Sequence, residues 1–315
     1  MAYGDVMAEL FMRLLLMERF SRNSFELIAA RQGVMDALLN VYYEAGNRSQ
    51  LPSIAIVDRY GVPTTSEFQL FAEYLSPRHH RRDLHARAVG LSQRADVRRR
   101  PAGGLHLQAG AQHGIGGEVR AGPSHRPRAA RRRICMANPF TCKVLHKKAS
   151  FAAVSDERNA HLFTAEELHG IRQHIPWTRV IEERFTYDVT GNAIDLLPWI
   201  AHNKDHLVIK PNDEYGGAGV IIGWEVSDDT WQAAITRSLS EPAIVQERVE
   251  IAYEGFPFVD ASDNIYIGRR LVDCDPFLFN GDHVGGCLVR LSSVTLLNVT
   301  AGGGSVVPAF IVDEK

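Results

Sequence analysis

Residues 209–224 read IKPNDEYGGAGVIIGW, and the interpretation of the C-terminal half of the chain rests on this stretch. An apolar run ends at Lys210, a polar turn follows, and a second apolar run comes after Gly216, Gly217 and Gly219. Glycine permits positive φ and close approach of the backbone to a ligand, and successive backbone N–H groups can surround a phosphate. A lysine beside them supplies positive charge. The pattern predicts a strand–loop–strand unit that holds phosphates, with a plain hairpin turn as the alternative.

The residues after the glycines exclude two common nucleotide-binding loops. No Gly-Lys-Ser/Thr is present, as a Walker A loop requires, and VIIGWEV reads as a strand where a dinucleotide fingerprint has a helix. Further along, PAIVQERV reads as a strand ending in Gln246 and Glu247. Edge backbone groups and a carboxylate at such a strand end suit an adenine amino group and a ribose hydroxyl; a strand running into solvent is the alternative reading.

The remaining pattern predicts an α+β fold. Residues 5–45 read as helices, 53–58 as a buried strand, and SEFQLFAEYL as a helix opened by Ser66. Thr164 and Glu167 form a capping box at the start of TAEELHGIRQHI, and Ser227 caps the helix DTWQAAITRSL. YIGRRLVDCDPFLF, HVGGCLVRLS and GGGSVVPAFIV read as strands. From residue 200 onward, antiparallel hairpins replace βαβ units.

Residues 78–133 differ in composition from the rest of the chain. They hold 14 Arg and three acidic residues, a net charge of +11, so the chain's total of −2 leaves −13 for the remainder. The segment has no Lys and no aromatic residue, and neither a helical nor a strand period continues through it. One interpretation is a basic arm that binds nucleic acid, although base-stacking aromatics are missing. The interpretation we favour is a stretch read out of frame between two compensating frameshifts, which predicts a disordered segment.

Several motifs together resemble the ATP-grasp superfamily, and most closely its circularly permuted branch, which is similar to glutathionylspermidine synthase. They are NPFTCKVLHKKASFA, VIKPNDEYGGAGV, VQERV and the pair GGCLVRLS and LLNVTAGGGSVVP. SIAIVDRYGVPTTSEFQLF looks like the strand–helix start of the pre-ATP-grasp domain in these proteins. The resemblance implies two α+β lobes around an ATP cleft, and an ATP-dependent carboxylate–amine ligase that forms an amide through an acyl phosphate.

The resemblance also implies roles for individual residues. Lys148 and Lys210 would hold the ATP phosphates beneath a flexible flap, and Arg290 would stabilise charge near the transferred phosphate. The flap would consist of Gly216, Gly217 and Gly219; Gln246 and Glu247 would face the adenine and ribose; and Asn298 with Gly302–Gly304 would line the same cleft. From the residues alone, Lys147 and Lys148 also read as solvated helix charges, Arg290 as a structural ion pair, and the triple glycine as a tight turn.

Chemistry of this kind needs Mg²⁺, which the family holds with Asp or Glu and a Glu-x-Asn pair. In the ordinary chain order Asp273, Asp275 and Asn298 are the candidates, whereas the permuted order places Glu-x-Asn ahead of the lysines. Residues 1–60 contain no Glu-x-Asn, so we expect a truncated N-terminus and leave the metal ligands unassigned. The chain is then either a ligase or a nucleotide-binding remnant without catalysis, with the basic-arm nucleic-acid binder ranked third.

These inferences define an expected organisation. We expect an N-terminal helical segment in residues 1–50, a partial pre-ATP-grasp α/β domain in residues 51–135, and an ATP-grasp domain in residues 136–315. Four cysteines without a CxxC pair indicate free buried thiols rather than a zinc site, and hence a reducing cytoplasm. The N-terminus has no basic leader, and its apolar run is interrupted by a charge. We therefore expect neither a signal peptide nor a membrane span, and no membrane as a partner. The carboxylate and amine substrates and the oligomeric state are left open.

Overall fold

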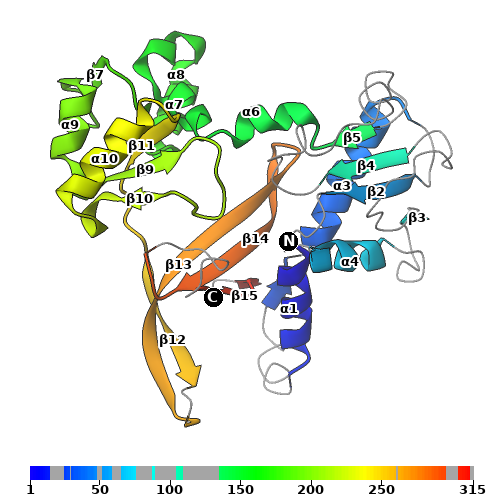
Figure 1. Cartoon of the computed structure of the whole chain (residues 1–315). Helices are drawn as coiled ribbons and strands as arrows, with labels where there is room; N and C mark the ends of the chain where they lie inside the picture. Colours follow the sequence, from blue (N-terminus) through cyan, green and yellow to red (C-terminus); the bar gives the residue numbers. More distant parts are fainter. Residues whose placement is uncertain are drawn as a thin grey trace. The chain divides into compact units, whose positions relative to one another are not determined.

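The computed structural model describes residues 1–14, 25–28, 30–47, 52–58, 65–75, 87–88, 104–108, 135–259, 262–295 and 304–312. The chain forms two compact units: unit 1 comprises Met1–Phe140 and Tyr253–Lys315, and unit 2 comprises Thr141–Ala252. Helices and mostly antiparallel sheets occur together, so the predicted α+β class is confirmed (Figure 1). Among the described helices, none combines the length and the apolar character that crossing a bilayer requires.

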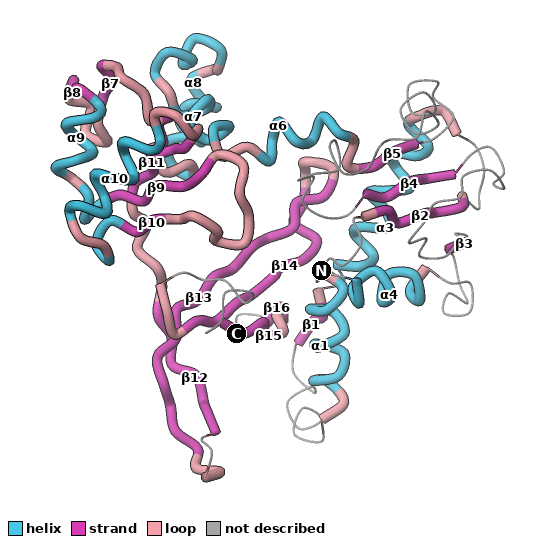
Figure 2. The backbone as a smooth tube through the Cα atoms, in the orientation of Figure 1, coloured by secondary structure: helices cyan, strands magenta, loops and turns pink. Residues whose placement is uncertain are grey.

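Unit 2 is built on an antiparallel sheet with the strand order β10-β9-β11-β6. Its strands are β6 (Thr178–Val180), β9 (Leu207–Pro211), β10 (Ile221–Ile222) and β11 (Ala243–Glu247). Figure 2 shows β9, β10 and β11 side by side. The predicted strand–loop–strand unit is confirmed, because β10 pairs with β9 across the glycine loop.

The second strand of that unit is shorter than predicted. Residues Gly223–Glu225 form a 3-10 turn, and only Ile221–Ile222 pair with β9. At Gly223 two backbone segments come close together, and an added Cβ would lie 1.8 Å from the carbonyl oxygen of Lys204. Glycine is therefore required here by close approach of two backbone segments rather than by a strand.

The core of unit 2 lies between the sheet and two helices. Helix α10 (Asp228–Ser238) buries Trp231, Ala234 and Ile235 at helical spacing, and α9 (Leu196–His202) adds Leu196 and Ile200. From the sheet, Leu207, Ile209, Ala243 and Val245 complete the cluster. The indole N–H of Trp231 donates to the carbonyl oxygen of Ile200 at 2.9 Å, so its one polar atom is satisfied.

The remaining elements of unit 2 surround β6. They are α6 (Lys143–His146), α7 (Ala149–Ser155), the 3-10 helix Glu157–Leu162, α8 (Ala165–His174), and the hairpin of β7 (Phe185–Tyr187) and β8 (Ala193–Asp195). Helix α7 packs against β6 and β11. The predicted capping box is confirmed: Thr164 Oγ1 accepts from the backbone of Glu167 and the Glu167 carboxylate accepts from the backbone of Thr164. The predicted Ser227 cap of α10 is confirmed as well.

Unit 1 contains a long antiparallel sheet with the order β12-β13-β14-β15. Its strands are β12 (Tyr253–Val259), β13 (Ile265–Phe279), β14 (His283–Ser292) and β15 (Gly304–Val307), and the last three fall where strands were predicted. A second, two-stranded sheet pairs β1 (Phe25–Leu27) with β16 (Phe310–Val312). Strand β1 corrects the prediction that residues 5–45 are helical throughout: three residues pair with the C-terminal strand, a long-range contact that helical periodicity does not reveal.

The other part of unit 1 is a parallel sheet with the order β3-β2-β4-β5. It consists of β2 (Ser53–Val57), β3 (Arg87–Ala88), β4 (Gly104–Gln108) and β5 (Cys135–Ala137), accompanied by α1 (Ala2–Met12), α3 (Ala30–Glu44) and α4 (Thr65–Tyr74). The predicted strand at 53–58 and the helix after it are confirmed, except that the helix begins at Thr65 and so is not opened by Ser66. A core of Met35, Tyr42, Ile54 and Leu75 joins α3 to this sheet.

One expectation about organisation differs from the structure. Strands β3 and β4 lie inside residues 78–133, where no regular structure was expected; parallel pairing uses backbone groups and needs no particular side chains. The rest of that segment lies outside the described residues, so the prediction that it is disordered stays a prediction. Residues 253–315 belong to unit 1, where α3 contacts β13 and β14 and β1 pairs with β16, and the expected ATP-grasp domain over residues 136–315 stays a prediction.

Candidate functional site

Two lysines predicted to hold phosphates come together in unit 2. Ile209 of β9 packs into the core, so Lys210, the next residue, projects from the other face of the sheet. The Nζ atom of Lys210 donates to Gln246 Oε1 at 2.6 Å, and burial lowers the pKa of Lys210, with the charge of Lys148 lowering it further. The two ammonium groups are thus close enough to repel each other.

Lys148 differs from its sequence neighbours in its partners. Its Nζ atom donates to the backbone carbonyl of Glu214 in the glycine loop. Burial lowers the pKa of Lys148, and this is opposed by the nearby carboxylates of Glu214 and Asp213. In the described part of the chain, no carboxylate forms an ion pair with the Nζ of Lys148 or Lys210. Both cations therefore retain capacity for an anion.

Lys147 and Lys143 are committed to a carboxylate. Lys143 Nζ lies 2.5 Å from Asp213 Oδ1, and Lys147 Nζ donates to Asp213 Oδ2. Although desolvation opposes the shift, hydrogen bonds from the two lysines hold the pKa of Asp213 at about 2. Of the alternatives left open for Lys147 and Lys148, the structure gives Lys147 an ion pair and directs Lys148 toward the glycine loop.

The glycine loop is built from left-handed backbone. Gly216, Gly217 and Gly219 have φ values of 65°, 79° and 68°, a region that disfavours residues with a Cβ. A Cβ on Gly219 would also lie 2.8 Å from Cγ of Pro211. Within the described residues, the amides of these glycines donate no backbone hydrogen bond. The three glycines are therefore required by conformation, and their N–H groups are available to a ligand.

Asn212 ties this loop to the residues that carry Lys148. Its carbonyl oxygen accepts from the backbone N–H of Lys148 at 3.0 Å, and its side-chain Oδ1 accepts from the N–H of Ala149 at 2.8 Å. The start of α7 and the start of the loop are consequently fixed to each other. Sequence analysis did not single out Asn212, because its partners lie more than sixty residues away and leave no local pattern.

Gln246 and Glu247 have partners that the sequence did not suggest. The amide of Gln246 bridges two groups: Oε1 accepts from Lys210, and Nε2 donates to Thr178 Oγ1 at 2.9 Å. Glu247 Oε1 accepts from the backbone N–H of Trp177 at 2.6 Å. Gln246 therefore joins β11 to β6 and fixes the position of the Lys210 ammonium, and Glu247 joins β11 to Trp177, the residue directly before β6.

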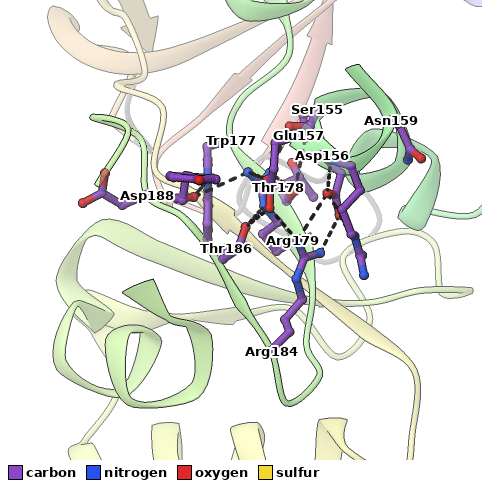
Figure 3. A network of polar contacts seen from close by, with 12 residues as sticks. Ser155, Asp156, Glu157, Asn159, Trp177, Thr178, Arg179, Arg184, Thr186 and Asp188 are labelled. Carbon is purple, nitrogen blue, oxygen red and sulfur yellow. Dashed lines mark hydrogen bonds and ion pairs between the residues drawn. The ribbon is translucent and has the colours of Figure 1, made fainter. Parts of the chain in front are cut away.

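A buried polar network holds β6 in place (Figure 3). Arg179, which is 3% exposed, donates from Nε to Thr186 Oγ1 at 2.8 Å and from a terminal nitrogen to Glu157 Oε2 at 2.8 Å. It also donates to the carbonyl oxygen of Ser155 at 3.0 Å and lies 4.9 Å over the ring of Trp177. Burial lowers the pKa of Arg179, while the Glu157 charge opposes that shift. These contacts link α7, β6 and β7.

Asp156 forms the second half of the same network. It is 5% exposed and accepts hydrogen bonds from Arg184 at 2.5 Å and Arg158 at 2.8 Å. Desolvation opposes the shift, but these bonds hold the pKa of Asp156 well below its usual value. Arg184 also donates to Glu157 Oε1 at 2.6 Å. A buried charge with several partners is costly to disrupt from one side only, so this network fixes the strand that carries Thr178.

Arg290 lies in unit 1 and forms an ion pair there. It stands opposite Asp273 on the paired strands β14 and β13, and donates both to Asp273 and, at 2.8 Å, to Asp275. Burial raises the pKa of Asp275, and the Arg290 charge opposes this. Of the roles left open for Arg290, the structure contains the ion pair. Asn298 and Gly302–Gly303 lie outside the described residues, and Gly304 begins β15.

The residues described do not supply a complete magnesium site. Asp273 and Asp275 share Arg290, and within the described chain no three His, Cys, Asp or Glu residues come together as metal ligands. The donor set therefore does not match the several oxygen ligands that Mg²⁺ prefers.

Unit 1 also contains an apolar cavity of about 280 Å³. It is lined chiefly by side chains of α3 and α4, among them Val34, Leu38, Phe68 and Phe71, with Glu67 at its wall. The carboxylate of Glu67 binds the backbone and terminal nitrogens of residues 1 and 2, so it is already satisfied. The cavity lacks the converging polar groups that the lysine site provides.

Comparison of the sequence with models of protein families gives no match, and comparison with curated proteins gives none. The geometry of the site therefore carries the functional argument.

The network around Asp156 predicts unequal effects of its two arginines. Arg184→Ala leaves Asp156 and Glu157 short of a buried partner, so we expect a loss of about 3 kcal/mol in the unfolding free energy of unit 2. Arg158→Ala removes a partner that is 57% exposed, and we expect a loss below about 1 kcal/mol. All four tryptophans lie in unit 2, so tryptophan fluorescence in urea measures its unfolding. Equal losses of unfolding free energy for the two variants would contradict the conclusion that Arg184 is the main buried partner of Asp156 and Glu157.

The Gln246 bridge predicts a change in the titration of Lys210. Gln246→Glu places a carboxylate against the ammonium group, so we expect the pKa of Lys210 to rise by about one unit or more. The pH dependence of acetylation at Lys210, followed by mass spectrometry, measures this, with Lys147 in the same digest as the internal reference. Gln246→Met, which adds no charge, is the matched control. An unchanged midpoint in the glutamate variant shows that Gln246 does not govern Lys210.

Proposed function

We propose that this chain is a nucleotide-binding protein of the ATP-grasp type, and that unit 2 holds the phosphates of ATP. The observation that supports this most directly is the pair Lys148 and Lys210: burial lowers the pKa of both ammonium groups, the charge of Lys148 lowers the pKa of Lys210 further, and neither forms an ion pair with a carboxylate within the described residues. An anion bound beside the two charges would favour the charged form of both lysines. A polyphosphate carries several charged oxygens for this purpose.

The glycine loop supports the same assignment. Its left-handed glycines present N–H groups without backbone partners in the described structure, and the loop is joined to Lys148 through Glu214. Backbone N–H groups in such conformations are suited to phosphate oxygens. In this proposal Gly216, Gly217 and Gly219 cover the phosphates, and β11 supplies the adenine and ribose contacts through the strand end at Glu247. Gln246 orients Lys210.

The chemistry that we propose is ATP-dependent ligation of a carboxylate to an amine. A carboxylate oxygen attacks the terminal phosphorus of ATP, ADP leaves, and an acyl phosphate forms. The amine nitrogen then attacks the acyl carbon, phosphate leaves, and the nitrogen gives up a proton. Positive charge from Lys148 and Lys210 would offset the charge that moves between the phosphates. Arg290 and Asn298 are the further residues implied for this reaction.

A second function, nucleotide binding without ligation, is favoured by one observation. A terminal nitrogen of Arg290 forms ion pairs with both Asp273 and Asp275 in unit 1, which leaves this nitrogen committed to two carboxylates. Nucleotide contacts in unit 2 do not depend on that group. The basic-arm proposal concerns residues 78–133, nearly all of which lie outside the described structure.

The lysine pair predicts loss of ATP affinity on neutralisation. Lys148→Met or Lys210→Met removes a charge-assisted contact worth about 1.5–3 kcal/mol, so we expect ATP to bind roughly 10- to 100-fold more weakly by calorimetry. Lys147→Met is the matched control: its ammonium is bound to Asp213, and affinity should stay within about threefold. Adenosine should bind all variants alike. If Lys147→Met weakened ATP binding as much as Lys148→Met, the proposed phosphate site would be wrong.

Binding and ligation are separated by a trapping experiment. A ligase converts carboxylates to acyl phosphates, which hydroxylamine captures as hydroxamates with stoichiometric release of ADP. We expect carboxylate-dependent hydroxamate formation with MgATP for at least one member of a panel of amino acids and peptides that includes glutathione. Lys210→Met is expected to abolish it. If calorimetry detects ATP binding but neither hydroxamate nor ADP is formed, ligation is rejected and nucleotide binding without ligation remains.

A further inference from the structure

Two cysteine thiols lie against each other on the long sheet of unit 1. The Sγ atoms of Cys274 on β13 and Cys287 on β14 are 3.0 Å apart. A disulfide bond needs about 2 Å between its sulfur atoms, so a closure of about 1 Å would join these two covalently. Cys274 is exposed and Cys287 is half-buried, which differs from the buried thiols that the sequence suggested.

The strand register explains this proximity. Cys274 lies opposite Val289, and Cys287 lies opposite Pro276. On β13, Pro276 is two residues after Cys274, and on β14, Cys287 is two residues before Val289. The two cysteines therefore occupy the same face as diagonal neighbours, within reach of each other in a twisted antiparallel pair. The register shifts between Pro276 and Leu278, directly beside Cys287, and such an irregularity increases the local twist.

We propose that Cys274 and Cys287 form a reversible intramolecular disulfide, with a small-molecule disulfide as the oxidant. The exposed Cys274 attacks the small disulfide as a thiolate, forming a mixed disulfide and releasing one thiol. Cys287 then attacks Cys274 Sγ, forming the protein S–S bond and releasing the second thiol. In total the protein loses two hydrogens and one small disulfide becomes two thiols. This inference is independent of the nucleotide site.

The other two cysteines do not share this geometry. Cys135 Sγ lies 3.8 Å from the carbonyl oxygen of Val41, and its pKa is raised by burial. Cys142 belongs to unit 2. Within the described residues, the sulfur atoms of Cys274 and Cys287 are in contact with each other. Cys135 and Cys142 therefore serve as internal reference thiols in the same protein.

The bond would fix the strand pair that also carries Arg290. Asp273 and Arg290 face each other on these strands, and Cys274 follows Asp273 directly, so its side chain lies on the opposite face of the sheet. A disulfide would therefore not touch the ion pair, yet it would prevent β13 and β14 from separating or changing register at that position. The face of β13 and β14 that carries Cys274 and Cys287 would then hold a disulfide whose formation depends on the ratio of small disulfides to thiols around the protein.

The test is disulfide mapping of the folded, full-length protein. Dilute reduced protein is incubated with oxidised glutathione, free thiols are alkylated, and peptides are analysed without reduction. Trypsin leaves both cysteines in Leu271–Arg290, because no Lys or Arg lies between them; cleavage before Asp275 and Asp282 separates them unless they are linked. We expect a linked pair, alkylated Cys135 and Cys142, and reversal by a dithiol. Cys287→Ser should instead retain glutathione on Cys274.

Several outcomes would overturn the proposal. Wild-type protein that keeps glutathione on Cys274 without a linked peptide shows that the two sulfurs do not close. Links from either cysteine to Cys135 or Cys142, or between two chains, show that the strand register is not what brings the thiols together. Oxidation in urea provides the comparison: if the linked pair forms there as readily as in the folded protein, folding does not direct it.

Discussion

The pairing of β9 with β11 is the constraint on which the nucleotide site depends. In this register Ile209 faces Val245, and Lys210 faces Ile244. Because side chains alternate between the two faces of a sheet, burial of Ile209 and Val245 against α9 and α10 forces Lys210 and Gln246 to the other face. A slip by one residue would bury the lysine in the core and expose the isoleucine. The apolar core thus sets the position of the charged group.

On that other face, the distribution of carboxylates decides which lysines remain available. Asp213 is shared by Lys143 and Lys147, while the carboxylate of Glu214 lies near Lys148 without forming an ion pair with it in the described structure. Lys148 and Lys210 are left with a backbone carbonyl and a side-chain amide as their partners. Neutral partners hold an ammonium group in position without cancelling its charge, and this is the electrostatic condition that an anion site requires.

The ion-pair network around Asp156 and Arg179 serves a different purpose. Buried ion pairs add little net stability compared with apolar packing, yet breaking one from one side is costly. Here they join the end of α7, strand β6 and the β7–β8 hairpin, and β6 is the strand whose Thr178 holds Gln246. The network is therefore best understood as a device that fixes the edge of the sheet and, through Thr178 and Gln246, the Lys210 ammonium.

Local features of this protein could be predicted from its amino-acid sequence. The strands around Lys210, the capping box of Thr164 and Glu167, and the left-handed glycines result from periodicity, capping and conformational rules that act over a few residues. Long-range contacts were needed to distinguish Lys148 from Lys147, to give Gln246 its bridge, to pair β1 with β16, and to bring Arg290 to Asp273. These contacts join residues that are not neighbours in the sequence, and no local preference encodes them, because they form only once folding has closed the chain between the partners.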